Sequence, residues 1–214
     1  MKNKNYFTFI ITTILCLLPI AIGLYFYDAL PEQIPTHFNF SGEIDGYTQK
    51  DLAIFGLPLF IVAINALTHF AVNNDPKNNN QNIFVFNFGK WVCPILSVIL
   101  VPASFYIALD NQLNINSITL NFVALIFIII GNYLPKCKQN YTIGIKLPWT
   151  LNSERNWNLT HRLATCIWVI SGLLILCLNF IKNSTIGTTV LISAILLSVV
   201  IPTIYSYILY SKGI

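Results

Sequence analysis

Four side chains able to bind a metal ion or to move a proton lie close together in the segment of residues 30–51. They are His37, Asn39, Glu43 and Asp45. An imidazole and two carboxylates are suitable metal ligands, and the same groups can serve as general acid and base. Their spacing matches no zinc or calcium motif. Three interpretations stay open: a metal or catalytic site, a hydrogen-bonded structural loop, and a surface that recognises an extracellular ligand.

A second polar group recurs at helical spacing. Glu154, Asn158, His161 and Arg162 lie at positions i, i+4, i+7 and i+8, so a helix would present them on one face. Glu154 and His161 could act as base and ligand in an intramembrane hydrolase, with Arg155 or Arg162 binding an oxyanion. The sequence has no H-E-x-x-H or G-x-S-x-G motif, and interfacial anchoring or binding of a cytoplasmic partner explains the same residues. We expect no catalytic residue, metal or cofactor; an enzyme would use Glu154, His161 and Arg162.

Local signals predict order in the first segment. Pro31 and Pro35 favour an extended backbone, and residues 36–40 alternate as a strand does. Ser41-Gly42 and Asp45-Gly46 are turn signals, so we predict a small hairpin or ordered loop.

The second segment carries equally specific signals. Pro135 and Pro148 interrupt any helix, and Gly144 allows a turn. Trp149 and Trp157 suit the headgroup region of a bilayer. We call residues 135–162 the signature loop.

Two residues are predicted to cap helices. Thr48 precedes the second apolar run of the chain, and Asn152 precedes a helix that has Glu154 in its first turn and continues into the fifth run. Both predictions rest on the preference of short polar side chains for the position before a helix.

The elements that must position these residues are membrane helices. Only 9% of the residues are charged, against about 25% in typical soluble domains, while 55% are hydrophobic and the mean hydropathy is +0.66. This composition excludes disordered and collagen-like chains and argues against a water-soluble enzyme. A membrane helix needs about 20 apolar residues, and six runs qualify: residues 7–27, 52–72, 88–109, 118–134, 163–181 and 186–210.

The lysine and arginine residues predict the orientation. With the N-terminus inside, only Lys50 and Lys182 lie outside. The ten on the inner side are Lys2, Lys4, Lys77, Lys90, Lys136, Lys138, Lys146, Arg155, Arg162 and Lys212. This positive-inside bias predicts that both termini are cytoplasmic.

The interiors of the runs hold few polar groups. Asn65 and His69 share one face of the second run. We expect Asn65 to bond between helices and His69 to lie at the interface; a conduction role is the alternative. Because no Asp, Glu, Lys or Arg lies near the centre of a run, the sequence does not favour an ion-coupled transporter.

We therefore predict an all-α integral membrane protein of the bacterial cytoplasmic (cell) membrane, multi-pass, with six transmembrane helices, cytoplasmic N- and C-termini and a small ordered extracytoplasmic loop. Residues 1–72 hold the first two helices with the extracytoplasmic loop 28–51. Residues 73–87 form a polar cytoplasmic linker. Residues 88–214 form a four-helix membrane region that contains the signature loop.

Both loops resemble a known family. The segment LPEQIPTHFNFSGEIDGYTQK is similar to a pattern close to LP-x-x-I-P-x-H-F-N-x-x-G-x-x-D-G-Y. The segment GNYLPKCKQNYTIGIKLPWTLNSERNWNLTHR is similar to N-x-x-G-I-R-T-P-W-T-L followed by W-x-x-T-H-R. Two matches in the right order identify the chain as a member of the SdpI-type bacteriocin-immunity proteins of Gram-positive bacteria, with their N-terminal outer-loop domain of unknown function. The resemblance covers about residues 1–180, and we expect it to extend over the whole chain, which makes region 88–214 SdpI-like.

The resemblance, together with the chemistry of the side chains, points to candidate binding residues in each loop. Those of the outer loop are Pro35, His37, Asn39, Glu43, Asp45 and Tyr47. Those of the inner loop are Asn140, Lys146, Pro148, Trp149, Thr150, Glu154, Arg155, Trp157, His161 and Arg162. The family pattern has Arg at the position of Lys146, and Lys lacks the planar bidentate guanidinium.

The resemblance implies protection of the producing cell from a secreted membrane-active peptide toxin, which the protein binds or blocks at the membrane. It also implies signalling by sequestering a cytoplasmic transcriptional repressor. The partners expected are the toxin peptide, the lipid bilayer and that repressor, with no direct contact to nucleic acid. The alternatives are an intramembrane hydrolase, peptidase-like, that acts on a peptide or lipid, and a toxin exporter.

Overall fold

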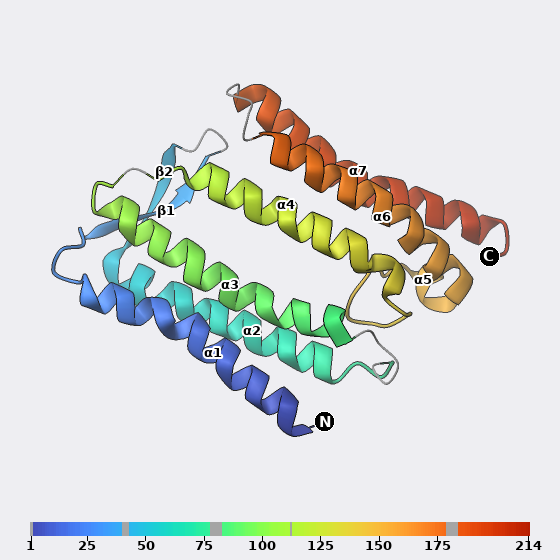
Figure 1. Ribbon diagram of the computed structural model, residues 1–214, viewed down its shortest axis with the longest axis horizontal. Coiled ribbons are helices and arrows are strands. Elements are labelled where there is room, and N and C mark those ends of the chain that lie inside the picture. The colour runs from blue at the N-terminus through green and yellow to red at the C-terminus, as the bar shows by residue number, and fades with distance from the viewer. Residues whose placement is uncertain (1, 40–42, 78–82, 112, 179–183) are drawn as a thin grey trace. The chain divides into compact units, whose positions relative to one another are not determined.

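The structure is a computed structural model that describes residues 2–39, 43–77, 83–111, 113–178 and 184–214. Its helices are α1 (Lys2–Tyr25), α2 (Leu57–Asn73), α3 (Ile83–Ala108), α4 (Ile115–Tyr133), α5 (Pro148–Asn152), α6 (Glu154–Cys177) and α7 (Ser184–Ser211), as Figure 1 shows. Shorter elements are the π-helix η1 (Leu52–Gly56), the 3-10 helix η3 (Leu134–Lys136) and the strands β1 (Gln33–Phe38) and β2 (Ile44–Gln49).

Among the residues that the structure describes, six helical segments are long and apolar enough to cross a membrane. They are Tyr6–Tyr25, Leu52–Asn73, Asn87–Ala108, Ser117–Lys136, Glu154–Cys177 and Ile186–Ser211. Each contains or overlaps one of the six runs, so the all-α membrane fold is confirmed. The orientation of the termini stays a prediction.

The chain divides into two compact units. Their boundaries differ from the predicted division at residues 73–87. The first is Met1–Asn74 with Asn87–Ile115, and the second is Asp75–Phe86 with Asn116–Ile214. The first thus contains α1, α2, the hairpin and nearly all of α3, and the second contains α4 to α7 and the signature loop.

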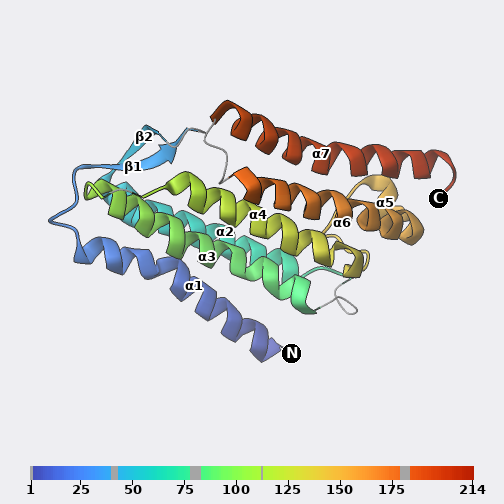
Figure 2. The same cartoon turned by 45° about the horizontal axis from the view of Figure 1, so that its top comes forward.

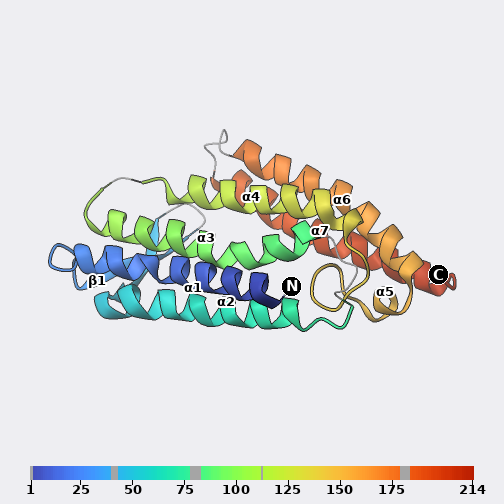
Figure 3. The same ribbon diagram turned by 60° about the horizontal axis from the view of Figure 1, so that its bottom comes forward.

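The first unit packs the base of the hairpin against its helices (Figures 1 and 3). Its buried apolar core consists of Leu30, Ile34, Ala53, Ile54, Val101 and Phe105. Ile34 lies on β1, Ile54 on η1 and Phe105 on α3, so a strand, a π-helix and a membrane helix share one core. This packing fixes the hairpin to the helix ends.

The second unit brings α6 and α7 together along their lengths (Figure 2). Its core centres on Ala124, Ile175 and Ala194, one from each of α4, α6 and α7. Gly172 permits the close approach of α6 to α4, because a Cβ there would lie 2.8 Å from the carbonyl oxygen of Ala124. Leu196, Val199 and Ile204 on α7 are about half exposed, which suits side chains solvated by lipid.

Candidate functional site

The predicted hairpin is present. β1 and β2 pair antiparallel with Pro35 opposite Tyr47 and His37 opposite Gly46. The Asp45-Gly46 turn prediction is wrong, because both residues belong to β2. The other turn signal, residues 41–42, lies outside the described residues.

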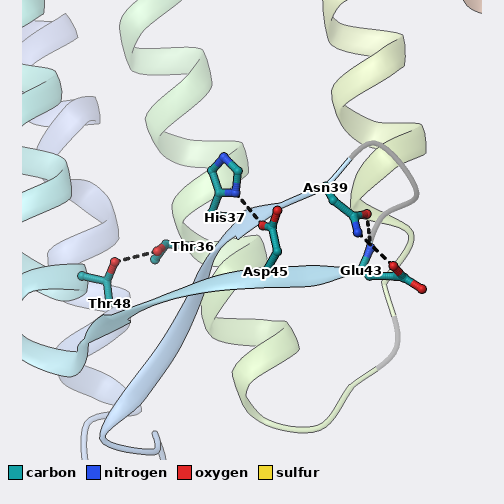
Figure 4. Close-up of polar contacts among 6 residues, drawn as sticks. All are labelled: Thr36, His37, Asn39, Glu43, Asp45 and Thr48. Carbon is teal, nitrogen blue, oxygen red and sulfur yellow. Dashed lines mark hydrogen bonds and ion pairs between the residues drawn. The ribbon is translucent and has the colours of Figure 1, made fainter. Parts of the chain in front are cut away.

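The polar side chains of the hairpin pair with each other across the strands (Figure 4). His37 Nδ1 contacts Asp45 Oδ1 at 2.5 Å, and the Asn39 amide donates to Glu43 Oε2 at 2.9 Å. Both pairs are solvent-exposed, with 74% of the His37 side chain accessible. No group of three such side chains able to hold a metal ion occurs within the described parts of the chain. Of the other outer candidates, Pro35 is buried and Tyr47 is 58% exposed.

Thr48 does not cap the following helix. Its hydroxyl lies 2.6 Å from that of Thr36 on the other strand. The cap prediction fails because Thr48 is inside β2, and a strand residue directs its side chain to a face of the sheet.

Lys50 fastens the base of the hairpin to the end of α1. Its ammonium donates to Leu30 O at 3.0 Å, pairs with Glu32 Oε1 at 3.0 Å and lies over the Tyr27 ring. The Tyr27 hydroxyl donates to Asp51 at 2.7 Å, and this hydrogen bond raises the pKa of Tyr27. The hairpin therefore has fixed polar attachments in addition to its apolar core.

Asn140 organises the first half of the signature loop. It is fully buried, its amide donates to Lys138 O and Ile143 O at 2.9 Å, and its oxygen accepts from Thr142 N and Ile143 N. The Asn140 side chain thus provides hydrogen-bond partners for backbone groups that have none from a regular helix or sheet.

Trp157 and His161 on α6 hold the same loop from the helix side. Trp157 Nε1 donates to Cys137 O at 2.7 Å, and its ring stacks on His161 at 4.0 Å. His161 Nδ1 donates to Trp157 O at 2.8 Å, while Nε2 accepts from Ile145 N at 3.0 Å. Since one neighbour can only accept and the other can only donate, His161 is neutral with its proton on Nδ1.

The second half of the loop forms the short helix α5. Pro148 occupies its first turn, and the buried Thr150 hydroxyl accepts from Leu147 N at 2.8 Å. Trp149 stacks on Tyr210 and meets Tyr207 edge-on. α5 is thereby joined to α7.

Asp75 and Lys77 attach the α2–α3 connection to the signature loop, a role that the sequence did not indicate. Asp75 is 7% exposed and accepts from Tyr141 N at 2.9 Å and from the Thr142 hydroxyl at 2.6 Å. Lys77 donates to Gln139 Oε1 at 2.6 Å. Nothing in the sequence around Asp75, a short Asn-rich segment, indicates that its hydrogen-bond partners lie more than sixty residues away.

The shared polar face of residues 154–162 is not formed as predicted. His161 is fully buried, whereas Glu154, Asn158 and Arg162 are exposed. The helix begins one residue later than predicted, with Ser153 as the N-cap that accepts from Asn156 N. Its continuation into the fifth membrane run is as expected.

Asn156 is a further buried residue of α6 that sequence reasoning missed. Its amide donates to Ser206 O at 3.0 Å, and its oxygen accepts from the Ser206 and Thr160 hydroxyls. These bonds join α6 to α7. The remaining inner candidates, Lys146 and Arg155, are exposed.

Asn65 bonds between helices as expected, donating to Thr12 Oγ1 of α1 at 3.2 Å. His69 is buried against the same Thr12 rather than placed at the interface. Asn65 Oδ1 and His69 Nδ1 are buried without a hydrogen-bond partner among the described residues.

Comparison with known proteins supplies the family. A domain of unknown function (DUF1648) matches residues 14–62, and the SdpI/YfhL protein family matches residues 136–206. The immunity protein SdpI of Bacillus subtilis (strain 168) is 30% identical over 203 residues, which cover 95% of this chain and 96% of the relative. The chain belongs to the SdpI/YfhL protein family. No solved structure matches it.

Membership of the SdpI/YfhL family confirms the resemblance seen in the two loops. The DUF1648 match contains the hairpin, and the SdpI/YfhL match contains most of the signature loop with α6. With six helices able to span a bilayer, this SdpI/YfhL protein is a multi-pass protein of the cell membrane.

Proposed function

We propose that this protein protects the cell that makes it from a secreted membrane-active peptide toxin, which it binds through the β1–β2 hairpin. The observation that carries the proposal is the near full-length similarity to an immunity protein. A hairpin that is anchored at its base and exposed along β2 is suited to binding a peptide from the aqueous side.

The test is survival and membrane potential of a sensitive Gram-positive strain. Cells expressing the full chain are challenged with the purified toxin to which the Bacillus subtilis relative confers immunity. Expressing cells should keep their potential while empty-vector cells depolarise. Equal depolarisation, with the protein confirmed in the membrane, would exclude immunity to this toxin.

The hydrolase alternative is disfavoured by the surroundings of His161. Both of its ring nitrogens have hydrogen-bond partners and its side chain is fully buried, so it has no free lone pair to take a proton from water. Mass spectrometry of the toxin recovered from protected cells should find it intact. Toxin fragments that appear only with the expressing strain would instead support the hydrolase function.

A second candidate function is signalling through the signature loop, in which a cytoplasmic repressor is held at the membrane. It is favoured by the rigid support of the loop, beside which Lys146, Arg155 and Arg162 remain exposed. A fusion of a reporter to the promoter of this gene tests it. Changing the three basic residues to Gln should abolish induction by toxin while survival is kept.

A further inference from the structure

The β1–β2 hairpin has two outer edges, and they differ. Along antiparallel strands, hydrogen-bonded pairs alternate with pairs whose backbone groups point away from the partner strand. The register continues to Glu32 opposite Lys50, where Lys50 N donates to Glu32 O at 3.0 Å. Three steps of alternation then make Pro35 and Tyr47 a non-hydrogen-bonded pair, with outward-pointing backbone groups.

The outer edge of β1 is closed. Proline has no N–H to offer at the outward position of residue 35, and Ile34 and Pro35 are buried. A strand added there would lack a donor and would have to displace the apolar core around Ile34.

The outer edge of β2 is open. Tyr47 directs its N–H and its C=O outward, and Gln49, two residues on, directs its N–H the same way. Within the described part of the chain, Tyr47 has no hydrogen bond outside the hairpin, and it is 58% exposed. An open edge of this kind can pair with a further strand, and proteins normally block such edges for that reason.

The charge around this edge selects the partner. Residues 28–51 hold one lysine, which is already paired with Glu32, and five exposed acidic residues: Asp28, Glu32, Glu43, Asp45 and Asp51. Glu43 and Asp45 lie at one end of β2, and Asp51 lies just beyond the other. An extended peptide with basic residues near its ends would meet opposite charge at both.

We propose that the outer edge of β2 binds an extended, cationic segment of the peptide toxin, which adds to the hairpin as a third strand through Tyr47 and Gln49. This mode of binding rests on the proposed immunity function. Backbone hydrogen bonds supply the affinity in such strand addition, and the flanking carboxylates supply the preference for a basic peptide.

The test pairs two variants at one position in the full chain, reconstituted in lipid nanodiscs. Tyr47→Ala removes the side chain and keeps the N–H, whereas Tyr47→Pro also removes the outward N–H without breaking a bond between β1 and β2. The probe is the toxin neutralised by the Bacillus subtilis relative. Tyr47→Pro should bind it about tenfold more weakly than Tyr47→Ala, the effect of one lost interfacial hydrogen bond. Equal affinities would overturn the proposal.

Amide hydrogen exchange of the unmodified protein gives a second readout that does not depend on a variant folding. Toxin should slow exchange at Tyr47 and Gln49, high salt should weaken the protection, and toxin N-methylated at consecutive residues, so that neither edge of the peptide can pair, should give none. Protection at these amides before toxin is added would mean that a second copy of the chain occupies the edge, and protection that persists with the methylated peptide would exclude strand addition; either result overturns the proposal.

Failure of the two proposals can be told apart. If the unmodified chain neither binds toxin nor protects cells, the immunity function itself fails for this toxin. If it binds and protects while Tyr47→Pro behaves as Tyr47→Ala, immunity stands and the strand-addition proposal falls.

Discussion

Gly144 is the residue at which one added methyl group would disturb the signature loop most directly. Its φ is 122°, and a Cβ there would lie 2.6 Å from His161 Nε2 and 2.8 Å from the Trp157 ring. Gly144→Ala should therefore cost about 1–3 kcal/mol of stability, measured by thermal unfolding in detergent. Gly187→Ala is the matched control, because nothing lies within 4 Å of its added Cβ. Equal melting of the two variants would contradict the role given to Gly144.

Cys137 is expected to be a slow nucleophile. Burial raises the pKa of its thiol to about 11. A raised thiol pKa favours the neutral form, so at neutral pH the thiolate is about a hundredfold scarcer than for a thiol of pKa 9.0. In a variant that keeps only Cys137, alkylation by iodoacetamide should be slow and should accelerate as the pH rises toward 11. An exposed cysteine introduced by Tyr141→Cys, in a background free of native cysteines, is the control; equal rates would show that Cys137 is not protected.

The sequence identified residues better than it identified their roles. Resemblance singled out Asn140, Trp157 and His161, and all three are buried within the network that holds the signature loop. Helical spacing placed His161 and Glu154 on one face. The spacing could not show that the signature loop packs onto α6 and buries His161 while Glu154 stays exposed. Asp75 could not be found, because its hydrogen-bond partners are distant in sequence.

At the scale of elements, Asp75 should couple the α2–α3 connection energetically to the signature loop. In a double-mutant cycle of Asp75→Asn and Thr142→Val, we expect an interaction energy of about 1–3 kcal/mol, because a charged acceptor and its half-buried donor are lost together. The measurement is chemical unfolding of the four proteins in micelles. Thr203→Val is the control partner, since its hydroxyl bonds within its own helix, to Val199 O. If the effects of the two substitutions are additive in both cycles, Asp75 does not couple the α2–α3 connection to the signature loop.

Membrane helices were predictable because their length and apolar composition follow from the bilayer alone. The hairpin was predictable from its prolines and alternation, but its turn was not. Asp45-Gly46 has the composition of a turn, yet Asp45 pairs with His37 and Gly46 lies opposite that residue, inside β2. Cross-strand pairing outweighed the local preference of two residues.

For the whole molecule, the two loops predicted to be cytoplasmic contact each other within the second unit. Asp75 accepts from Tyr141 N, and Lys77 donates to Gln139. Two loops separated by the two spans of α3 and α4 must lie on one side of the membrane. The contacts thus support the predicted alternation of loops independently of the lysine and arginine count, although they do not say which side is cytoplasmic.

Cysteine labelling of intact cells determines that side. In a cysteine-free background, Tyr47→Cys on the hairpin should react with a membrane-impermeant maleimide added outside, because the positive-inside bias places residues 28–51 there. Tyr141→Cys, about equally exposed, should react only after permeabilisation. Reversed labelling would invert the topology. It would also remove the hairpin from the reach of a secreted peptide, so that strand addition at β2 could not protect the cell.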